Sequence, residues 1–178
     1  MKHHDFGSYR SMLDIGGNSG EFALQVCRNF SDLSAIVMDL PLVCQIGREH
    51  LAREPEVDRI RFLPGDALEA AMPTGFDLVT FKSVLHDWPE DKVARFLGQA
   101  FQSLKPEGTL LIFERGSDIV DLSRLSFSAI PMLLFFRSFR SPIIYQGLLE
   151  AGGFHRVKIE RIDLDAPFFL VTAKKKLV

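Results

Sequence analysis

An apolar run that ends in an acid and a glycine-rich turn is the feature of this sequence that most constrains its fold. Residues 12–20 read MLDIGGNSG, and apolar residues at helical spacing follow from Phe22 onward. A strand, a tight turn and a helix that opens near Gly20 are typical of the ligand-binding corner of a doubly wound α/β domain. Glycine suits this corner because a backbone without Cβ atoms can turn sharply and approach a ligand closely.

The spacing of these glycines separates two classes of cofactor. A dinucleotide fingerprint reads G-x-G-x-x-G, whereas this loop reads D-x-G-G-x-x-G and begins at Asp14. A carboxylate at this point repels a pyrophosphate and attracts a ligand with ammonium and sulfonium charges. S-adenosylmethionine is such a ligand, and we expect Asp14, Gly16, Gly17 and Gly20 to contribute to its site. Taken alone, the loop also fits a βα turn that binds nothing.

Composition favours one globular domain. The chain has 178 residues, of which 47% are apolar and 25% charged, so it can bury a sizeable core. The formal net charge is -2, which argues against nucleic acid as the main partner. Cys27 and Cys44 fall in helix-like segments and are expected to be reduced core residues of a cytoplasmic protein.

The remaining features of composition predict neither a membrane segment nor a metal site. No signal peptide is visible, and the longest apolar stretch, residues 129–136, is too short to span a bilayer. His3 and His4 are expected to lie in a disordered N-terminus rather than to bind metal. The lysine run at residues 174–176 is expected to be solvated.

Strands and helices alternate along most of the chain. Apolar runs predict five strands, at residues 11–16, 35–38, 60–63, 76–81 and 109–113. Helices are expected at residues 20–30, 41–53 and 89–104, with a turn at 105–108. Beyond these, we expect an apolar helix at 118–139, a helix at 142–151, and an edge hairpin of strands 154–164 and 168–173 that turns near Pro167. Apolar strands that alternate with helices predict a parallel sheet buried on both faces.

Charged side chains lie at or just beyond the carboxyl ends of five successive strands. They are Asp14, Asp39, Asp66, Lys82 and Glu114. In a parallel sheet these ends form one rim, where ligands of doubly wound folds bind. Asp39 is placed to accept the hydroxyls of a ribose, and Asp66 to accept the exocyclic amine of adenine. Singly, these residues also fit as helix caps, a surface lysine and a loop acid.

His86-Asp87-Trp88 leaves the fourth strand towards the same rim. A histidine there is a candidate general base because its pKa lies near working pH. Glu114 is expected to orient the imidazole and to favour its charged form. For His86, the alternative is a capping or packing role. Trp88 is a candidate to cover a flat base, and the alternative for Trp88 is a position in the core.

Five motifs occur in order, namely LDIGG at residues 13–17, DLP at 39–41, GD at 65–66, KxxxHDW at 82–88 and LKPxG at 104–108. They resemble the class I S-adenosylmethionine-dependent O-methyltransferases of the caffeic acid, isoflavone and acetylserotonin type, with relatives in bacterial natural-product pathways. The resemblance runs from about residue 8 to the C-terminus. It implies an α/β, Rossmann-like, mostly parallel seven-stranded sheet with a C-terminal antiparallel hairpin.

The resemblance also implies roles for individual residues. The cofactor would be held by Gly16, Asp39, Leu40, Asp66, Ala67 and Lys82, with Trp88 beside the adenine. His86 would remove the proton of an acceptor hydroxyl, and Glu114 would support it.

The sequence departs from the family pattern at three places. Asn18 replaces the third glycine of D-x-G-G-G-x-G, and asparagine tolerates unusual backbone angles. Ile144 stands where plant-type enzymes place a second acid against the histidine, so His86 is expected to have one carboxylate partner. Full-length members carry an N-terminal helical dimerisation domain, and residues 1–178 are expected to be the catalytic domain alone.

The leading hypothesis is methyl transfer to a hydroxyl of a small aromatic or natural-product acceptor. One alternative keeps the cofactor but promotes hydroxylation or decarboxylation without methyl transfer. Another is a truncated, inactive domain that acts by binding, with the apolar residues 127–139 as a homodimer interface or a docking surface for another chain. The loop spacing disfavours a nicotinamide dehydrogenase.

Overall fold

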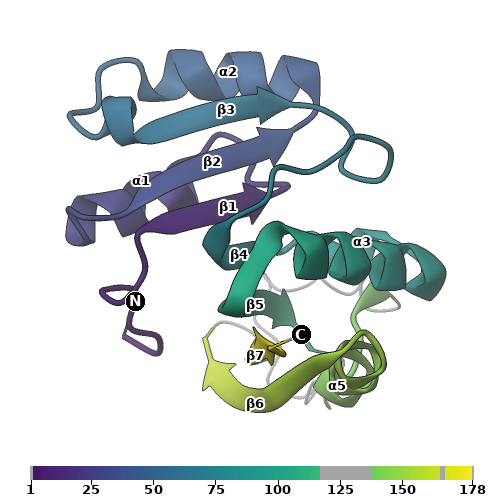
Figure 1. The fold of residues 1–178 in the computed structure, drawn as a ribbon. Coiled ribbons are helices and arrows are strands. Elements are labelled where there is room, and N and C mark those ends of the chain that lie inside the picture. The colour runs from purple at the N-terminus through teal and green to yellow at the C-terminus, as the bar shows by residue number, and fades with distance from the viewer. Residues whose placement is uncertain (1, 117–137, 165–166, 178) are drawn as a thin grey trace.

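A computed structural model describes residues 2–116, 138–164 and 167–177. Seven strands form one sheet in the order β3-β2-β1-β4-β5-β7-β6, and the first five along the chain are parallel. β7 runs antiparallel to both of its neighbours. This topology, visible in Figure 1, confirms the predicted fold class. The strands are β1 (Ser11–Ile15), β2 (Ser34–Asp39), β3 (Ile60–Pro64), β4 (Phe76–Lys82), β5 (Leu104–Arg115), β6 (Phe154–Asp163) and β7 (Pro167–Lys175).

Helices cover the two faces of the sheet. α1 (Glu21–Asn29) and α2 (Pro41–Leu51) pack against β2 and β3, whereas α3 (Glu90–Ser103) packs against β4 and β5. α5 (Pro142–Ala151) lies against β6 and β7 (Figure 1). α2 and α5 begin with proline, which lacks the amide hydrogen that a first helical residue leaves unbonded. Two short 3₁₀ turns, η1 (Val57–Arg59) and η2 (Leu85–Asp87), complete the described elements.

Each face of the sheet has its own apolar core. Successive side chains of a strand point to opposite faces, so Met12 and Leu13 of β1, both fully buried, belong to different clusters. Met12 packs with residues of α1, and Leu13 packs with residues of α3. Cys27 and Cys44 are buried and free, which confirms their predicted core positions.

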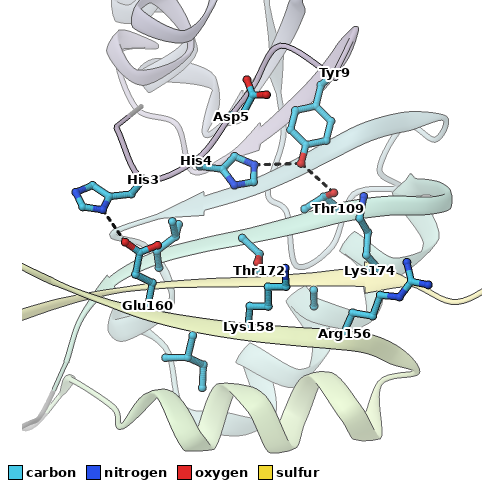
Figure 2. Close-up of a pocket in the computed structure, with 13 residues that line it drawn as sticks. His3, His4, Asp5, Tyr9, Thr109, Arg156, Lys158, Glu160, Thr172 and Lys174 are labelled. Atoms are coloured by element: carbon cyan, nitrogen blue, oxygen red, sulfur yellow. Dashed lines mark hydrogen bonds and ion pairs between the residues drawn. The ribbon is translucent and has the colours of Figure 1, made fainter.

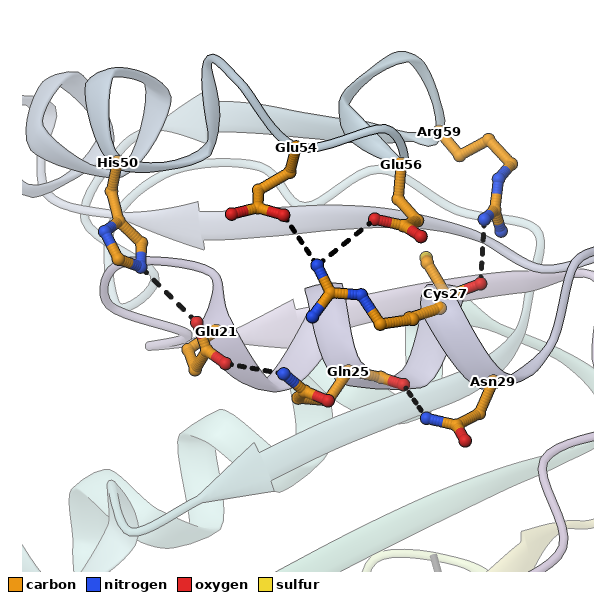
Figure 3. A network of polar contacts seen from close by, with 9 residues as sticks. Glu21, Gln25, Cys27, Asn29, His50, Glu54, Glu56 and Arg59 are labelled. Carbon is orange, nitrogen blue, oxygen red and sulfur yellow. Dashed lines mark hydrogen bonds and ion pairs between the residues drawn. The ribbon is translucent and has the colours of Figure 1, made fainter.

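A surface network fixes α1 and η1 to each other (Figure 3). Arg59 donates to the backbone carbonyls of Cys27, Phe30 and Leu33 at 2.8–3.2 Å. Arg28 pairs with Glu54 at 2.6 Å, although exposed ion pairs of this kind contribute less than about 1 kcal/mol each. Arg59 bonds to the end of α1 away from the glycine turn, whereas Glu21, at the start of the helix, contacts His50 of α2 at 3.3 Å.

β5 begins earlier than the sequence predicted. Leu104 already pairs with Phe76, and regular pairing then resumes at Thr109 opposite Leu78. The expected turn at residues 105–108 is therefore an irregular stretch inside β5, and Glu107 there has a φ of 60°.

The C-terminal lysines explain this difference. Lys175 Nζ donates to the carbonyl of Leu104 at 2.8 Å, and Lys174 Nζ donates to the carbonyl of Glu107 at 3.1 Å. Lys175 also lies 4.8 Å from the centre of the Phe101 ring. The prediction of a solvated lysine run is thus wrong for Lys174 and Lys175, because β7 brings both to the backbone of β5.

Parts of two predictions lie outside the described residues. The expected apolar helix at 118–139 and the dimer surface at 127–139 are described only at Ser138 and Phe139, and the hairpin turn near Pro167 only from Pro167 onward. Among the described helices, none combines the length and the hydropathy that crossing a bilayer requires.

Candidate cofactor and active site

The turn after β1 has the backbone geometry that its sequence predicts. Gly16 and Gly20 have φ angles of 67° and 80°, in the left-handed region that glycine enters without a steric penalty. Asn18 takes a φ of 53°, which asparagine tolerates better than most residues. The amide of Gly16 donates to the carbonyl of Met38 at 2.8 Å and thereby anchors the turn to β2.

Asp14 is a fully buried acid with a single side-chain partner. The β1–β4 register sets Asp14 opposite Thr80, whose hydroxyl donates to Oδ1 at 2.6 Å. Oδ2 is buried without a hydrogen-bond partner in the structure. Burial raises the pKa of Asp14 to about 6, while the Thr80 bond and the charge of Lys82 act in the opposite direction. A buried acceptor without a donor is costly, which points to a ligand that supplies the donor.

A cleft of about 270 Å³ opens beside this carboxylate. Its lining fits a zwitterionic amino-acid group, because it presents carboxylates for an ammonium and the Lys82 ammonium for a carboxylate. A Cβ on Gly17 would lie 2.4 Å from Asp14 Oδ2, so only glycine leaves that oxygen its space. The cleft is lined by Asp14, Gly16, Gly17, Asn18, Ser19, Glu21, Phe22, Lys82 and Ser83. Four predicted cofactor residues therefore meet here.

Asp39 lies on the same rim, at the end of β2. Its Oδ2 accepts from the Asn18 amide and its Oδ1 from the Leu40 amide, both at 2.8 Å. These bonds hold the carboxylate at the end of β2 beside the glycine turn, and each oxygen keeps a lone pair for a ligand. Leu40 itself precedes α2 and is 52% exposed.

Asp66 and Ala67 follow β3 at the same edge. The Gly65 amide donates to the carbonyl of Asp39 at 2.9 Å, which ties the ends of β2 and β3 together. Asp66 is exposed, and its Oδ1 accepts from the amide of Leu68 at 2.8 Å. Ala67 is half-buried. The structure thus places these residues on the predicted rim but outside the cleft of Asp14.

His86 is held by a buried carboxylate. Its Nδ1–H donates to Glu114 Oε2 at 2.7 Å, and Glu114 Oε1 accepts from the amides of Val84 and Leu85, each at 2.7 Å. Glu114 is only 1% exposed. The bond to Glu114 raises the pKa of His86 above its ordinary value, although burial opposes this shift. Because Nδ1 is occupied, Nε2 is the nitrogen available to a substrate.

A second acid lies close to the imidazole. Asp87 Oδ1 is 3.4 Å from His86 Nε2, so the expectation of one carboxylate partner is wrong. Asp87 is the next residue in the chain, whereas the family pattern places a second acid in a later helix. Ile144, at that position, is 38% exposed on α5.

Trp88 is half-buried and packs against the apolar core, and its place beside the adenine stays a prediction. Its ring packs edge-on against Phe96 of α3, with 5.5 Å between ring centres. Two residues that the sequence analysis missed lie near the histidine. The ring centre of Phe139 is 5.5 Å from that of His86, and Arg140 donates to the carbonyls of Leu85 in η2 and of Trp88, the residue that follows η2. Thr80 was also missed, and a hydroxyl among the apolar residues Leu78, Val79 and Phe81 was its available signal.

Another cavity is separate from this rim. It has a volume of about 590 Å³ and lies between the N-terminal residues and β6–β7 (Figure 2). No predicted cofactor or catalytic residue lines it. His3 and His4 do line it, and they bond to Glu160 at 2.7 Å and to Tyr9 at 3.1 Å, so the expectation of a disordered N-terminus is wrong for them.

The carboxyl ends of the strands carry a glycine turn, a buried acid and a histidine bonded to a carboxylate. These features define the class of Rossmann-like domains that bind a nucleoside cofactor at the carboxyl ends of their strands. Residues 1–155 match the family described as the O-methyltransferase domain. The chain therefore belongs to the O-methyltransferase family. S-adenosylmethionine, which the sequence predicted, is the cofactor of this family.

Several relatives share this domain. The mitomycin biosynthesis 6-O-methyltransferase of Streptomyces lavendulae is 32% identical over 162 residues, which are 89% of this chain and 44% of that protein. The acetylserotonin O-methyltransferase of Bos taurus is 31% identical over 160 residues, 88% of this chain and 46% of the relative. The chain thus spans less than half the length of these two relatives.

The solved structures support the fold. Human N-acetylserotonin methyltransferase in complex with S-adenosylmethionine gives a TM-score of 0.80 at 24% identity, over 99% of this chain and 50% of that one. The mitomycin 7-O-methyltransferase MmcR gives a TM-score of 0.82 at 28% identity, over 96% of this chain and 50% of that one.

Proposed function

We propose that this chain transfers a methyl group from S-adenosylmethionine to a hydroxyl of a small aromatic or natural-product acceptor, with His86 as the general base. The observation that carries this proposal is the buried Glu114, which holds His86 by Nδ1 at 2.7 Å. Nε2, which lies 3.4 Å from the exposed carboxylate of Asp87, is then the nitrogen that takes the proton. The same rim bears the unpartnered carboxylate oxygen of Asp14.

When bound, the cofactor supplies an activated methyl group on a sulfonium centre. In the proposal, Asp14 and Lys82 bind its amino-acid part, and the glycine turn allows close approach. Asp39 binds the ribose, and Asp66 with Ala67 borders the adenine. Holding the two reactants in line supplies much of the rate enhancement of such a transfer.

His86 removes the proton of the acceptor in this mechanism. A phenol with a pKa of about 10 is only slightly ionised at neutral pH, so a base at Nε2 increases the reactive phenolate. The Glu114 carboxylate then stabilises the imidazolium that forms, since it contacts Nδ1 directly.

The names of relatives support an aromatic acceptor. One is the 3-hydroxy-5-methyl-1-naphthoate 3-O-methyltransferase of Streptomyces sahachiroi, 34% identical over 110 residues, 62% of this chain and 32% of that one. The bovine relative is named for acetylserotonin. Incubation of the chain with S-adenosylmethionine and either compound should yield a product heavier by one methyl group. Cofactor binding without any product would instead favour a binding role, and a hydroxylated or decarboxylated product would favour the non-methylating alternative.

Replacement of Asp39 by alanine should weaken cofactor binding. Hydrogen bonds to a charged acceptor contribute about 1.5–3 kcal/mol each, so loss of the ribose contacts should raise the Kd by at least about tenfold. Calorimetric titration with S-adenosylhomocysteine measures this change. Asp32→Ala is the matched control, because this exposed acid precedes β2 at the opposite end from Asp39. Equal affinities of Asp39→Ala and Asp32→Ala would contradict the ribose assignment.

A further inference from the structure

The turn that carries His86 is held at its amides and at its carbonyls by groups of opposite charge. On one side, Glu114 Oε1 accepts from the amides that open the turn. On the other side, Arg140 Nη1 donates to the carbonyl of Leu85 at 2.8 Å, and Arg140 Nη2 donates to the carbonyl of Trp88. His86 and Asp87 lie between these two carbonyls, so one guanidinium bridges the segment that bears the proposed base.

Arg140 is itself fixed by its neighbours. It forms an isolated parallel bridge with Gly116, one residue beyond β5, and β5 is also the strand that carries Glu114. The next residue, Ser141, caps α5 and its hydroxyl accepts from the amide of Ile143 at 3.4 Å. The preceding residue, Phe139, is only 7% exposed and packs edge-on against the imidazole. The guanidinium therefore reaches the turn from a defined position.

We propose that Arg140 is a positioning residue that holds the η2 turn so that His86 keeps its bond to Glu114 and directs Nε2 to the acceptor. This inference rests on the proposed role of His86 as the base. A planar guanidinium can donate to both carbonyls at once, because its donors are arranged in a rigid fork. A lysine is a single flexible charge and can replace one of the two contacts but does not reproduce the fork.

Substitution of Arg140 should lower turnover while cofactor binding persists. We expect Arg140→Gln to reduce kcat by about tenfold to a hundredfold, since small misplacements of a catalytic group have effects of that size. Arg140→Lys should recover only part of this loss. The Kd for S-adenosylhomocysteine should stay unchanged, because Arg140 does not line the cleft of Asp14. Arg95→Gln, at an exposed position of α3, is the matched control and should retain full activity.

The imidazole of His86 supplies a readout that does not require turnover. The charged groups near it are Glu114, Asp87 and Arg115, and the bond to Glu114 is the main cause of its raised pKa. If Arg140 holds the turn, Arg140→Gln should weaken this bond and lower the pKa of His86 towards its ordinary value. NMR titration of the histidine rings, with the His86→Ala spectrum as the assignment, measures the shift in the full chain.

The two hypotheses fail in different ways. With 3-hydroxy-5-methyl-1-naphthoate as acceptor, Arg140→Gln should have no further effect on kcat in a His86→Ala background if both act through one base. An unchanged pKa of His86 in folded Arg140→Gln would overturn the positioning role, whatever the activity. A lowered pKa with unchanged turnover would show that Arg140 supports the bond between His86 and Glu114, but that His86 is not the base. Loss of activity that merely parallels loss of folded protein would also overturn the positioning role.

Discussion

His86→Ala is expected to lower the kcat of methyl transfer by about a hundredfold to ten-thousandfold, the range that a general base contributes. The affinity for S-adenosylhomocysteine should stay the same, because His86 is not among the residues that line the cleft of Asp14. Single-turnover assays with a phenolic acceptor measure the loss. His155→Ala is the matched control, since this histidine also lies against a carboxylate, 3.2 Å from Glu107, but on β6. Equal turnover of the two variants would exclude His86 as the base.

The pH dependence of the wild-type rate follows from the same contact. Glu114 raises the pKa of His86, so the imidazole is charged, and inactive as a base, at pH values up to and somewhat above its ordinary pKa. The rate should therefore rise with pH through this raised pKa and then level off. Glu114→Gln keeps the shape of the side chain but removes its charge, so the rise should move to lower pH while the maximal rate falls. An unchanged pH profile in Glu114→Gln would show that Glu114 does not set the pKa of the group that acts as the base.

The sequence predicted the rim because its signals are local. Each parallel strand is a short apolar run. The acid or lysine that follows it can be assigned to the rim from its position in the sequence alone. The glycine turn is equally local, since positive φ at Gly16 and Gly20 is a property of the backbone itself. The start of β5 was missed because Leu104 belongs to the strand only through its partner Phe76 and the lysine of β7, both distant in sequence.

The site residues that the sequence did not predict are placed by strand register and by contacts between segments that are far apart in the sequence. Thr80 meets Asp14 because β1 and β4 pair at that residue, and a pairing register is not visible in either strand alone. Arg140 contacts the η2 turn although it lies 55 residues after Leu85 in the sequence, and no spacing rule relates it to His86. Asp87 was recognised as part of a motif, but its contact with Nε2 depends on the 3₁₀ geometry of the turn.

Asp14→Asn is expected to stabilise the free protein above pH 6 and to weaken its cofactor binding. The pKa of Asp14 rises from 3.8 to about 6 on folding because the carboxyl is buried. Between these values the native state binds more protons than the unfolded state, so the free energy of unfolding falls as pH rises. At 1.36 kcal/mol per pKa unit, the penalty reaches roughly 3 kcal/mol above pH 6. Asparagine carries no such penalty and keeps an acceptor for the Thr80 hydroxyl.

Urea unfolding of both proteins between pH 4 and pH 8 tests the stability effect, with exposed Asp58→Asn as the control. The advantage of Asp14→Asn should be absent near pH 4 and grow up to about pH 6, where the wild-type carboxyl becomes ionised. Binding should change in the opposite direction, because the ammonium of S-adenosylhomocysteine stabilises the ionised carboxylate. Wild-type affinity should therefore rise with pH through the same window, and near pH 6 binding should release protons, which calorimetry in two buffers detects. In Asp14→Asn the affinity should be lower by about tenfold or more and lack this slope. If Asp14→Asn binds S-adenosylhomocysteine as tightly as wild type at pH 8, the unpartnered oxygen of Asp14 does not contact this ligand.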